Sequence, residues 1–164
     1  MEAKSKIQFV KDLANKKVNV IRDFNAPVDK VWKAWTDPAV LDQWWAPKPW
    51  KAQTKSMDFR VGGTWMYAMV GPDGVPTWCR VDYEAIEPKV RFSGKDAFCD
   101  EKGIPSGEFP VSYWDCTFKE TSTGSRVEIV VSYATVADLE KIAALGFEEG
   151  FTMALTNLDE WLMI

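Results

Sequence analysis

The chain of 164 residues contains no histidine. Histidine is the side chain that most often serves as general base, proton shuttle and zinc ligand near neutral pH. Its absence excludes a Ser-His-Asp or Cys-His relay, a zinc site built on paired histidines and an iron site of two histidines and a carboxylate. Any catalysis would depend on carboxylate, lysine, tyrosine or cysteine side chains. No spacing in the sequence singles out a catalytic residue or a metal ligand, so we expect neither a metal nor a cofactor.

Basic runs, long apolar segments and cysteine motifs are also missing. No run of basic residues is longer than Lys16-Lys17, and a net charge of −4 argues against nucleic-acid binding, which needs a basic surface. No apolar stretch approaches the roughly 20 residues of a membrane span, and the N-terminus lacks the apolar core of a secretory signal. Cys79, Cys99 and Cys116 show no C-x-x-C spacing, which is typical of reduced thiols. We therefore expect a cytoplasmic protein without a nucleic-acid partner or a membrane span.

Tryptophan, in contrast, is abundant. The chain has nine, and five of them fall between positions 32 and 50. An indole brings a large apolar surface and one N–H that needs a partner when buried, so such a cluster marks either an aromatic core or the wall of a pocket. The length and the 46% hydrophobic content are those of one globular domain over residues 1–164.

The first part of the chain predicts a hairpin followed by two short helices. Apolar and polar residues alternate over residues 7–11 and 17–24, which indicates two paired strands. After a break at Pro27, the residues Val31, Trp32 and Trp35 recur at helical spacing and predict a helix over residues 28–36. Thr36-Asp37-Pro38 ends that helix and begins a second one over residues 38–45.

The remainder predicts a sheet covered by a long helix. Between residues 52 and 133 the pattern has period two, and turn residues at 62–63, 71–74, 87–88, 100–107 and 121–125 leave room for five strands. Helix formers dominate residues 137–162, with an apolar stripe interrupted by Gly146 and Gly150. The order predicts an α+β fold with an antiparallel sheet of about six to eight strands. A sheet of this width coils as it twists, so we expect a pocket between it and the helix.

These segments carry a family resemblance. The motifs are FNAPVDKVWKAWTDP at residues 24–38, LDQWWAP at residues 41–47, DFRVGGTW at residues 58–65 and GPDG at residues 71–74. With the closing Gly150-Phe151 and Asn157-Leu158-Asp159, they resemble the SRPBCC (START-like) superfamily over nearly the full chain. More narrowly, the chain is similar to homologues of the C-terminal domain of the activator of the heat-shock-protein-90 ATPase.

The resemblance implies the helix-grip fold, in which a curved antiparallel sheet wraps a long C-terminal helix around a deep hydrophobic cavity. Two short helices follow the first strands. The superfamily includes lipid carriers, hormone receptors, polyketide cyclases, oxygenase subunits and co-chaperone domains. The resemblance therefore implies a fold rather than one activity.

Strand parity and helix spacing select the residues that would line the cavity. We expect a set of aromatic and methionine side chains to face a ligand: Trp45, Trp50, Trp65, Tyr67, Met69, Tyr83, Phe98, Trp114, Phe118, Phe147, Phe151 and Met153. Ordinary core packing is the alternative for each of them. Trp78 shares the outer face with Arg80, and the loop at 100–107 is long enough to act as a flap over the cavity mouth. Asp96, Asp100 and Glu101 form a charge run, which indicates solvation.

Three hypotheses for function follow. The first is a non-enzymatic binding module that takes a small or medium hydrophobic ligand, such as a lipid, into the cavity. The second is a protein-interaction or stress-regulatory role, linked to a chaperone, with Trp78 or Trp50 as anchor. The third is a cyclase- or hydrolase-like enzyme that acts on an aromatic or polyketide-like substrate through Tyr67, Tyr83 and a carboxylate. Free sheet edges would also permit a homodimer.

Overall fold

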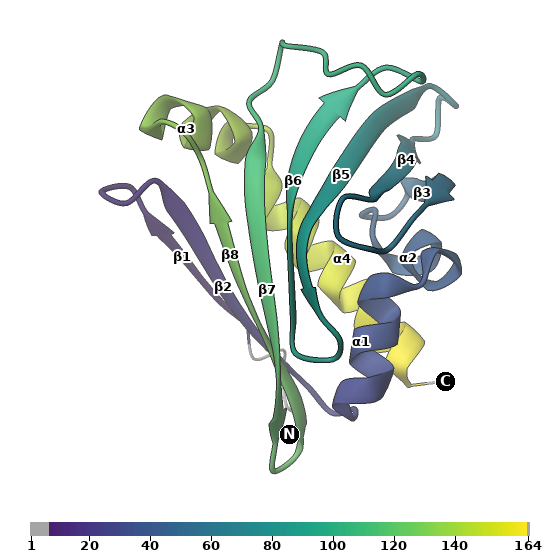
Figure 1. Ribbon diagram of the computed structural model, residues 1–164, viewed down its shortest axis with the longest axis vertical. Coiled ribbons are helices and arrows are strands. Elements are labelled where there is room, and N and C mark those ends of the chain that lie inside the picture. Colours follow the sequence, from purple (N-terminus) through teal and green to yellow (C-terminus); the bar gives the residue numbers. More distant parts are fainter. Residues whose placement is uncertain (1–6, 164) are drawn as a thin grey trace.

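The computed structural model describes residues 7–163 and shows a curved antiparallel sheet closed by the C-terminal helix (Figure 1). The strands are β1 (Ile7–Asp12), β2 (Lys17–Phe24), β3 (Lys51–Met57), β4 (Thr64–Val70), β5 (Pro76–Glu87), β6 (Arg91–Cys99), β7 (Ser112–Thr121) and β8 (Gly124–Ser132). The helices are α1 (Val28–Thr36), α2 (Pro38–Trp44), α3 (Val136–Ala144) and α4 (Phe147–Leu162).

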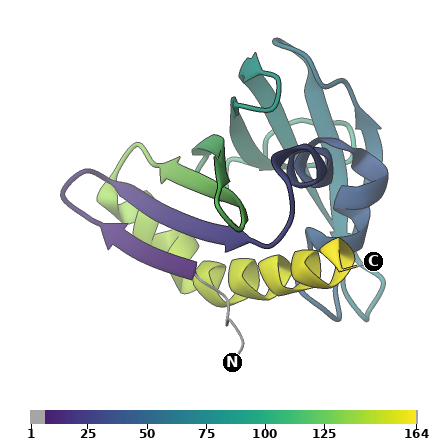
Figure 2. The same cartoon turned by 90° about the horizontal axis from the view of Figure 1, so that it is seen from below.

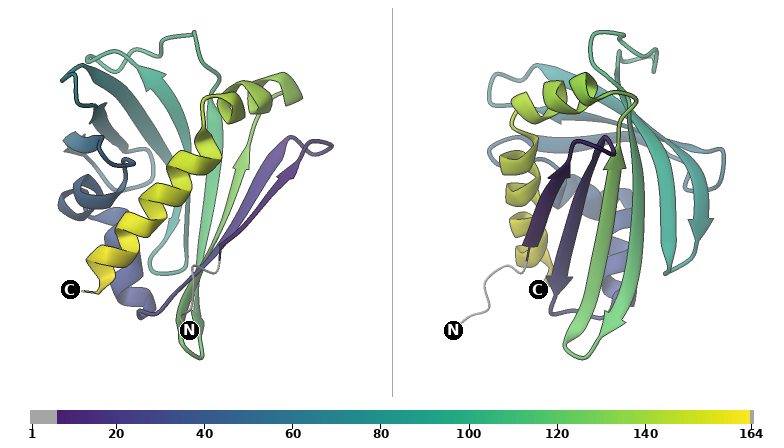
Figure 3. Two further views of the ribbon diagram at one scale, coloured as in Figure 1. Left: turned by 180° about the vertical axis from the view of Figure 1, so that it is seen from behind. Right: turned by 90° about the vertical axis from the view of Figure 1, so that its left-hand side faces the viewer.

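One eight-stranded sheet has the order β1-β2-β8-β7-β6-β5-β4-β3. The helices α1 and α2 carry the chain from β2, near one edge, to β3 at the other edge. Seen from below, the sheet forms a trough and α4 lies along its open side (Figure 2). Figure 3 shows that α4 runs diagonally across the strands and that α3 lies next to the N-terminal end of α4. The predicted α+β, helix-grip architecture is confirmed.

Alternation of side chains sets the inner and outer faces of the sheet. On β8, Ser125, Val127, Ile129 and Val131 are buried, and the residues between them are only half-buried. Successive side chains of a strand point to opposite faces, so this pattern places one face of β8 against the core. The predicted hairpin of β1 and β2 is confirmed, with Ile7 paired to Arg22 and Asp12 paired to Lys17.

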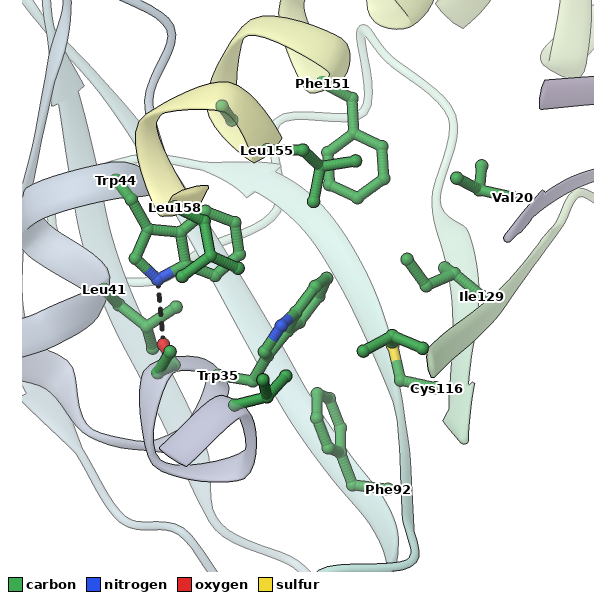
Figure 4. Packing of buried hydrophobic residues seen from close by; sticks show 14 of the residues in the cluster. Val20, Trp35, Leu41, Trp44, Phe92, Cys116, Ile129, Phe151, Leu155 and Leu158 are labelled. Carbon is green, nitrogen blue, oxygen red and sulfur yellow. Dashed lines mark hydrogen bonds between the residues drawn. The ribbon is translucent and has the colours of Figure 1, made fainter. Parts of the chain in front are cut away.

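The two predicted short helices are confirmed and form a compact aromatic corner. The side chain of Asp37 accepts a hydrogen bond from the Ala39 N–H at 2.9 Å and caps α2, and proline is at the first position of that helix. The helix ends at Trp44, one residue earlier than expected. The Trp44 indole N–H donates to the Ala34 carbonyl at 2.9 Å, which ties α2 to α1 (Figure 4).

The sequence prediction differs from the structure in the number of strands and in the last helix. Residues 51–132 form six strands, β3 to β8, and not five. The five predicted turns were placed correctly, but five turns separate six strands. The predicted helix over residues 137–162 is two helices, because Gly146 adopts φ 90° between α3 and α4. This left-handed conformation is accessible to glycine without a steric penalty, and it ends α3.

The lower half of the trough is a solid aromatic core. Trp35 lies at its centre in Figure 4, between side chains of α4 and the sheet residues Phe92 and Cys116. Its ring centroid is 4.9 Å from that of Trp44, and the Trp32 centroid is 5.0 Å from that of Phe118. Edge contacts at these distances stabilise aromatic pairs beyond their burial alone. Within residues 7–163, no helix is long and apolar enough to cross a membrane.

An ion pair between a buried arginine and a partly exposed aspartate joins the sheet to α4. Arg22 on β2 is 2% exposed, and its Nη1 donates to Asp159 Oδ1 at 3.1 Å and to the Asp23 carbonyl at 2.9 Å. A second contact joins Nη2 to Oδ2 of Asp159. The guanidinium also lies 4.7 Å from the centroid of the Phe24 ring. A charged group this deeply buried depends on its partners, because desolvation of an unpaired charge is costly.

We predict that Asp159→Ala lowers the free energy of unfolding by about 2 to 3 kcal/mol, because Arg22 would stay buried without its carboxylate. The matched control is Glu160→Ala on the same helix, where the exposed pair of Glu160 with Lys48 at 2.9 Å should contribute less than about 1 kcal/mol. Urea denaturation of both variants measures the difference. Equal losses of stability for the two variants would contradict this account.

Candidate functional site

Above the aromatic core, α4 and the sheet border a cavity of about 250 Å³ that is partly open to solvent. It exceeds the roughly 150 Å³ that holds benzene in an engineered apolar cavity, and it is slightly smaller than the roughly 300 Å³ of the smallest drug-sized sites. The space therefore suits a molecule of one or two rings. Its lining comes from the strands, the end of α2 and both C-terminal helices: Trp45, Pro47, Tyr67, Met69, Cys79, Asp96, Ala97, Phe98, Pro110, Ser112, Trp114, Tyr133, Ile142, Leu145, Gly146, Phe147, Gly150 and Phe151.

Aromatic rings form the wall between the core and the cavity. Trp45, at the end of α2, lies 5.8 Å from Trp114 and 6.1 Å from Phe151, measured between ring centroids. Phe147 and Phe151 are one helical turn apart on α4 and stack at 5.5 Å. Trp114 meets Phe151 edge-on at 5.5 Å. These contacts hold the rings in place around the empty volume.

The indole N–H groups of this wall already have acceptors. Trp45 Nε1 donates to the Tyr67 hydroxyl oxygen at 2.9 Å, and Trp114 Nε1 donates to Ser112 Oγ at 3.2 Å. Buried polar groups of this kind need partners, and both are satisfied within the protein. The two indoles therefore offer a ligand their apolar faces.

Asp96 is the acidic side chain of the cavity lining. It lies on β6 opposite Val81 of β5 and Ser112 of β7, is half-buried and lines the cavity. Among residues 7–163, no side chain or backbone N–H hydrogen-bonds to its carboxylate, and no cation pairs with it. Burial alone raises the pKa of Asp96 to about 7. The carboxylate is therefore held in an apolar site without a donor.

The neighbouring titratable groups keep their protons. Burial raises the pKa of Tyr67, Cys79 and Tyr133, and the negative charge of Asp96 raises each of them further. Between mildly acidic and mildly basic pH, Asp96 is thus the cavity group whose charge changes. The cavity lining contains no lysine or arginine.

The prediction that Asp96 is solvated was wrong. Its strand buries Phe92 and Gly94 and places Phe98 in the cavity lining, so Asp96 occupies the same inward-facing register. The alternation of residues 92, 94, 96 and 98 could have been read from the sequence. Asp96 was instead grouped with the charged residues Asp100 and Glu101. Asp100 and Glu101 are exposed, as expected. The side chain of Asp100 accepts hydrogen bonds from the backbone N–H groups of Lys102 and Ile104.

Most of the predicted lining residues border empty space. Those that border the main cavity are Trp45, Tyr67, Met69, Phe98, Trp114, Phe147 and Phe151. Trp65 and Tyr83 line a deeper void of about 30 Å³, which they share with Trp45, Trp114 and Asp96. A void of this size is large enough for about one water molecule.

Three predicted lining residues do not border either space. Trp50 is 38% exposed and packs on Gly71, where a Cβ atom would lie 3.0 Å from the indole ring. Phe118 faces inward as expected, but Trp32 and Trp35 cover it and make it part of the solid core. Met153 is 43% exposed, because a residue two positions beyond Phe151 points to the other side of α4.

The expected flap at residues 100–107 is attached to the outer face of the sheet. Lys55 Nζ donates to the Glu101 carbonyl at 2.8 Å, and Arg80 Nη1 donates to the Gly103 carbonyl at 2.7 Å. The chain then returns toward α3, where Phe109 packs on Phe98 with ring centroids 5.0 Å apart. Only the residue that follows, Pro110, reaches the cavity.

Sequence reasoning missed the part of the lining contributed by α3 and by the strand ends. Ile142 belongs to α3 and Leu145 is the residue that caps its C-terminus. The continuous-helix prediction had merged α3 with α4. Tyr133 follows the last residue of β8. Within the part of the chain that the structure describes, no three cysteine, aspartate or glutamate side chains come close enough to hold a metal ion.

The raised pKa of Asp96 makes the stability of the protein depend on pH. The folded state favours the protonated carboxyl, so its contribution is complete below the unfolded-state pKa of about 4 and is lost as pH rises through about 7. We predict that Asp96→Asn, which cannot ionise, is more stable than wild type at about pH 8, by up to about 4 kcal/mol. Urea denaturation across this range should show the difference closing toward about pH 4. A constant difference would contradict the raised pKa.

Comparisons with known proteins agree with this architecture. A crystal structure of a protein from Mycobacterium smegmatis is 31% identical, covers 95% of this chain and 96% of that chain, and superposes with a TM-score of 0.88. A solution structure of a protein from Arthrobacter aurescens is 30% identical over 95% of this chain and 91% of that chain, with a TM-score of 0.90. The AHSA1 protein from Silicibacter pomeroyi shares the fold at 19% identity, over 90% of this chain and 97% of that chain, with a TM-score of 0.72.

A search of curated proteins found no match. The family model described as Activator of Hsp90 ATPase homolog 1-like protein matches residues 25–163, which include α1, α2 and every strand from β3 to β8. The match agrees with the resemblance that the motifs of residues 24–74 carry. The chain therefore belongs to the family of Activator of Hsp90 ATPase homolog 1-like proteins.

Proposed function

We propose that this protein is a non-enzymatic binding module that takes a small hydrophobic ligand of one or two rings into the cavity beneath α4. The observation that carries the proposal is an aromatic-lined space of about 250 Å³ next to an aromatic core in which the deeper void is only about 30 Å³. Protein interiors normally close-pack, so a void of this size next to tight packing supports a binding role.

The contacts to such a ligand would come from two opposed surfaces. Phe147 and Phe151 of α4 form one surface, and Tyr67, Met69 and Phe98 of the sheet form the other. Trp45 and Trp114 close the inner end. Ring faces of this kind bury an aromatic ligand with little loss of side-chain entropy, because the protein contacts already fix their rotamers.

Gly150 keeps the α4 side of the cavity open. A Cβ atom at this position would meet only Pro47 Cγ at 3.7 Å, an ordinary van der Waals distance. Alanine therefore fits without displacement, whereas a longer side chain would extend into space bordered by Pro47 and Phe151. Glycine within a helix costs about 1 kcal/mol relative to alanine, so its presence here reduces stability and preserves space.

We predict that Gly150→Leu weakens binding of 3-propylindole, a neutral probe with two fused rings, by about tenfold or more, because the leucine side chain occupies the cavity. The matched control Gly150→Ala should bind the probe nearly as wild type does. Both variants should be more stable than wild type, by about 1 kcal/mol for alanine. Calorimetric titration measures the affinity. If Gly150→Leu binds as tightly as Gly150→Ala, the ligand does not enter this cavity.

A second candidate function is proton transfer by Asp96. The third sequence hypothesis required a carboxylate but did not identify one. A base with a pKa of about 7 in an apolar site is suited to proton abstraction near neutral pH. With 5-nitrobenzisoxazole as probe, the Asp96 carboxylate would take the C3 proton while the ring N–O bond breaks, which gives 2-cyano-4-nitrophenolate. Wild type should accelerate this ring opening and Asp96→Asn should not. Equal rates would remove the enzymatic candidate.

The protein-interaction hypothesis has weaker support, because both of its proposed anchors have contacts within the chain. Trp78 is half-buried with Lys55 Nζ 5.6 Å from its ring, and Trp50 covers Gly71. A chaperone or other protein partner, a homodimer paired through the edge strands β1 and β3, the single-domain organisation and a cytoplasmic location stay predictions.

A further inference from the structure

We propose that the ligand of this cavity carries a protonated amine next to its ring system and that the ammonium group pairs with the carboxylate of Asp96. This inference rests on the proposed binding function and names the class of ligand. It begins from the position of one acidic side chain in a space that is otherwise lined mainly by carbon.

The carboxylate of Asp96 is placed to meet a ligand. Asp96 borders both the main cavity and the deeper void, so it lies where the two spaces approach each other. Trp45 donates to Tyr67 and Trp114 donates to Ser112. Trp35 also lines the deeper void, and its indole N–H has no hydrogen-bond acceptor in the part of the chain that the structure describes, so it does not serve the Asp96 carboxylate either. Within residues 7–163, no donor serves the Asp96 carboxylate.

The charge in the cavity favours a cation. No lysine or arginine is among the lining residues, and the other titratable groups there, Tyr67, Cys79 and Tyr133, stay neutral near physiological pH. An unpaired carboxylate in such surroundings is destabilised, and a bound ammonium removes that penalty by forming a charge-assisted hydrogen bond. An anionic ligand would add a like charge instead.

The aromatic wall supports the same choice. Trp45 and Trp114 border the main cavity and the deeper void together with Asp96, so two indole faces lie near the position of the ammonium. A cation within about 6 Å of an indole face is attracted by the electrons of the ring. The carboxylate would fix the charged end of the ligand, and Phe147 and Phe151 would cover its ring system.

The pairing should depend on pH through Asp96 alone. The titratable groups that line the two spaces with it are Tyr67 of β4, Cys79 and Tyr83 of β5, Cys116 of β7 and Tyr133 after β8. Burial raises the pKa of each of them, so none changes charge at neutral pH. The lining residues of α3 and α4 carry no charge. Because Asp96 ionises as pH rises through about 7, the affinity for an amine should rise over the same range.

Three indole probes separate the effect of charge from that of the apolar contacts. Tryptamine and 3-propylindole have side chains of the same length, and indole-3-propionate carries a negative charge on a side chain two atoms larger. At about pH 8, we expect tryptamine to bind wild type about tenfold more tightly than 3-propylindole, and indole-3-propionate to bind least tightly. Asp96→Asn should bring the ratio of the first two affinities to about one. Glu84→Gln removes an exposed carboxylate from the outer face of β5 and serves as the control that keeps the ratio.

Calorimetry in two buffers with different ionisation enthalpies adds a second measurement. At about pH 6.5, binding of tryptamine should release a proton from Asp96 in wild type, whereas binding of 3-propylindole should release none. This measurement uses the unaltered protein, so it does not depend on any structural change caused by Asp96→Asn.

The outcomes separate the two proposals. If 3-propylindole binds at least as tightly as tryptamine, if Asp96→Asn keeps the preference, or if no proton is released, the amine inference is overturned and the apolar binding function stands. If none of the three probes binds, the binding function itself fails, and the amine inference fails with it.

Discussion

The indole of Trp45 makes the contact on which both halves of the interior depend. Its ring centroid is 5.2 Å from that of Trp44 and 5.8 Å from that of Trp35 on the side of the packed core, and 5.8 Å from that of Trp114 at the cavity. Its N–H donates to the Tyr67 hydroxyl, so the ring is held by a hydrogen bond and by ring contacts. A side chain fixed in this way cannot move into the space above it. The cavity therefore persists beside a close-packed core.

The unpaired carboxylate of Asp96 is unfavourable for folding and useful for binding. A neutral residue at this position would remove the desolvation cost. Arg22, by comparison, is a buried charge that the chain pairs with an opposite charge on Asp159. The carboxylate of Asp96 has no such partner within residues 7–163, and it lines the apolar space of about 250 Å³ above the core. Polar groups without partners are concentrated at functional sites, because a bound ligand can provide the missing hydrogen-bond or charge partner.

Sequence patterns predicted the architecture because its periodicities are strong. Alternation identified β2 and β8, and helical spacing with Asp37-Pro38 identified α1 and α2. The break at Gly146 was missed because helix formers continue on both sides of it, so nothing local ends the pattern. Phe118 and Phe151 both face inward. Trp32 and Trp35 cover Phe118, whereas Phe151 borders the cavity, and only the three-dimensional packing determines this difference. Parity finds the inner face of a strand, but it cannot tell core from cavity wall. Asp96 was missed for a different reason. Its charge led to the prediction of a solvated side chain, although its position in the strand alternation indicated the inner face.

The central claim is that an empty apolar space lies between α4 and the sheet in the protein without a ligand. A crystal structure determined under xenon pressure tests it most directly, because xenon enters dry apolar cavities and scatters strongly. The account predicts xenon density among Trp45, Trp114 and Phe151, with the surrounding rings unmoved. A structure without xenon there, in which the rings of Trp45 and Phe151 have closed over Asp96, would contradict it.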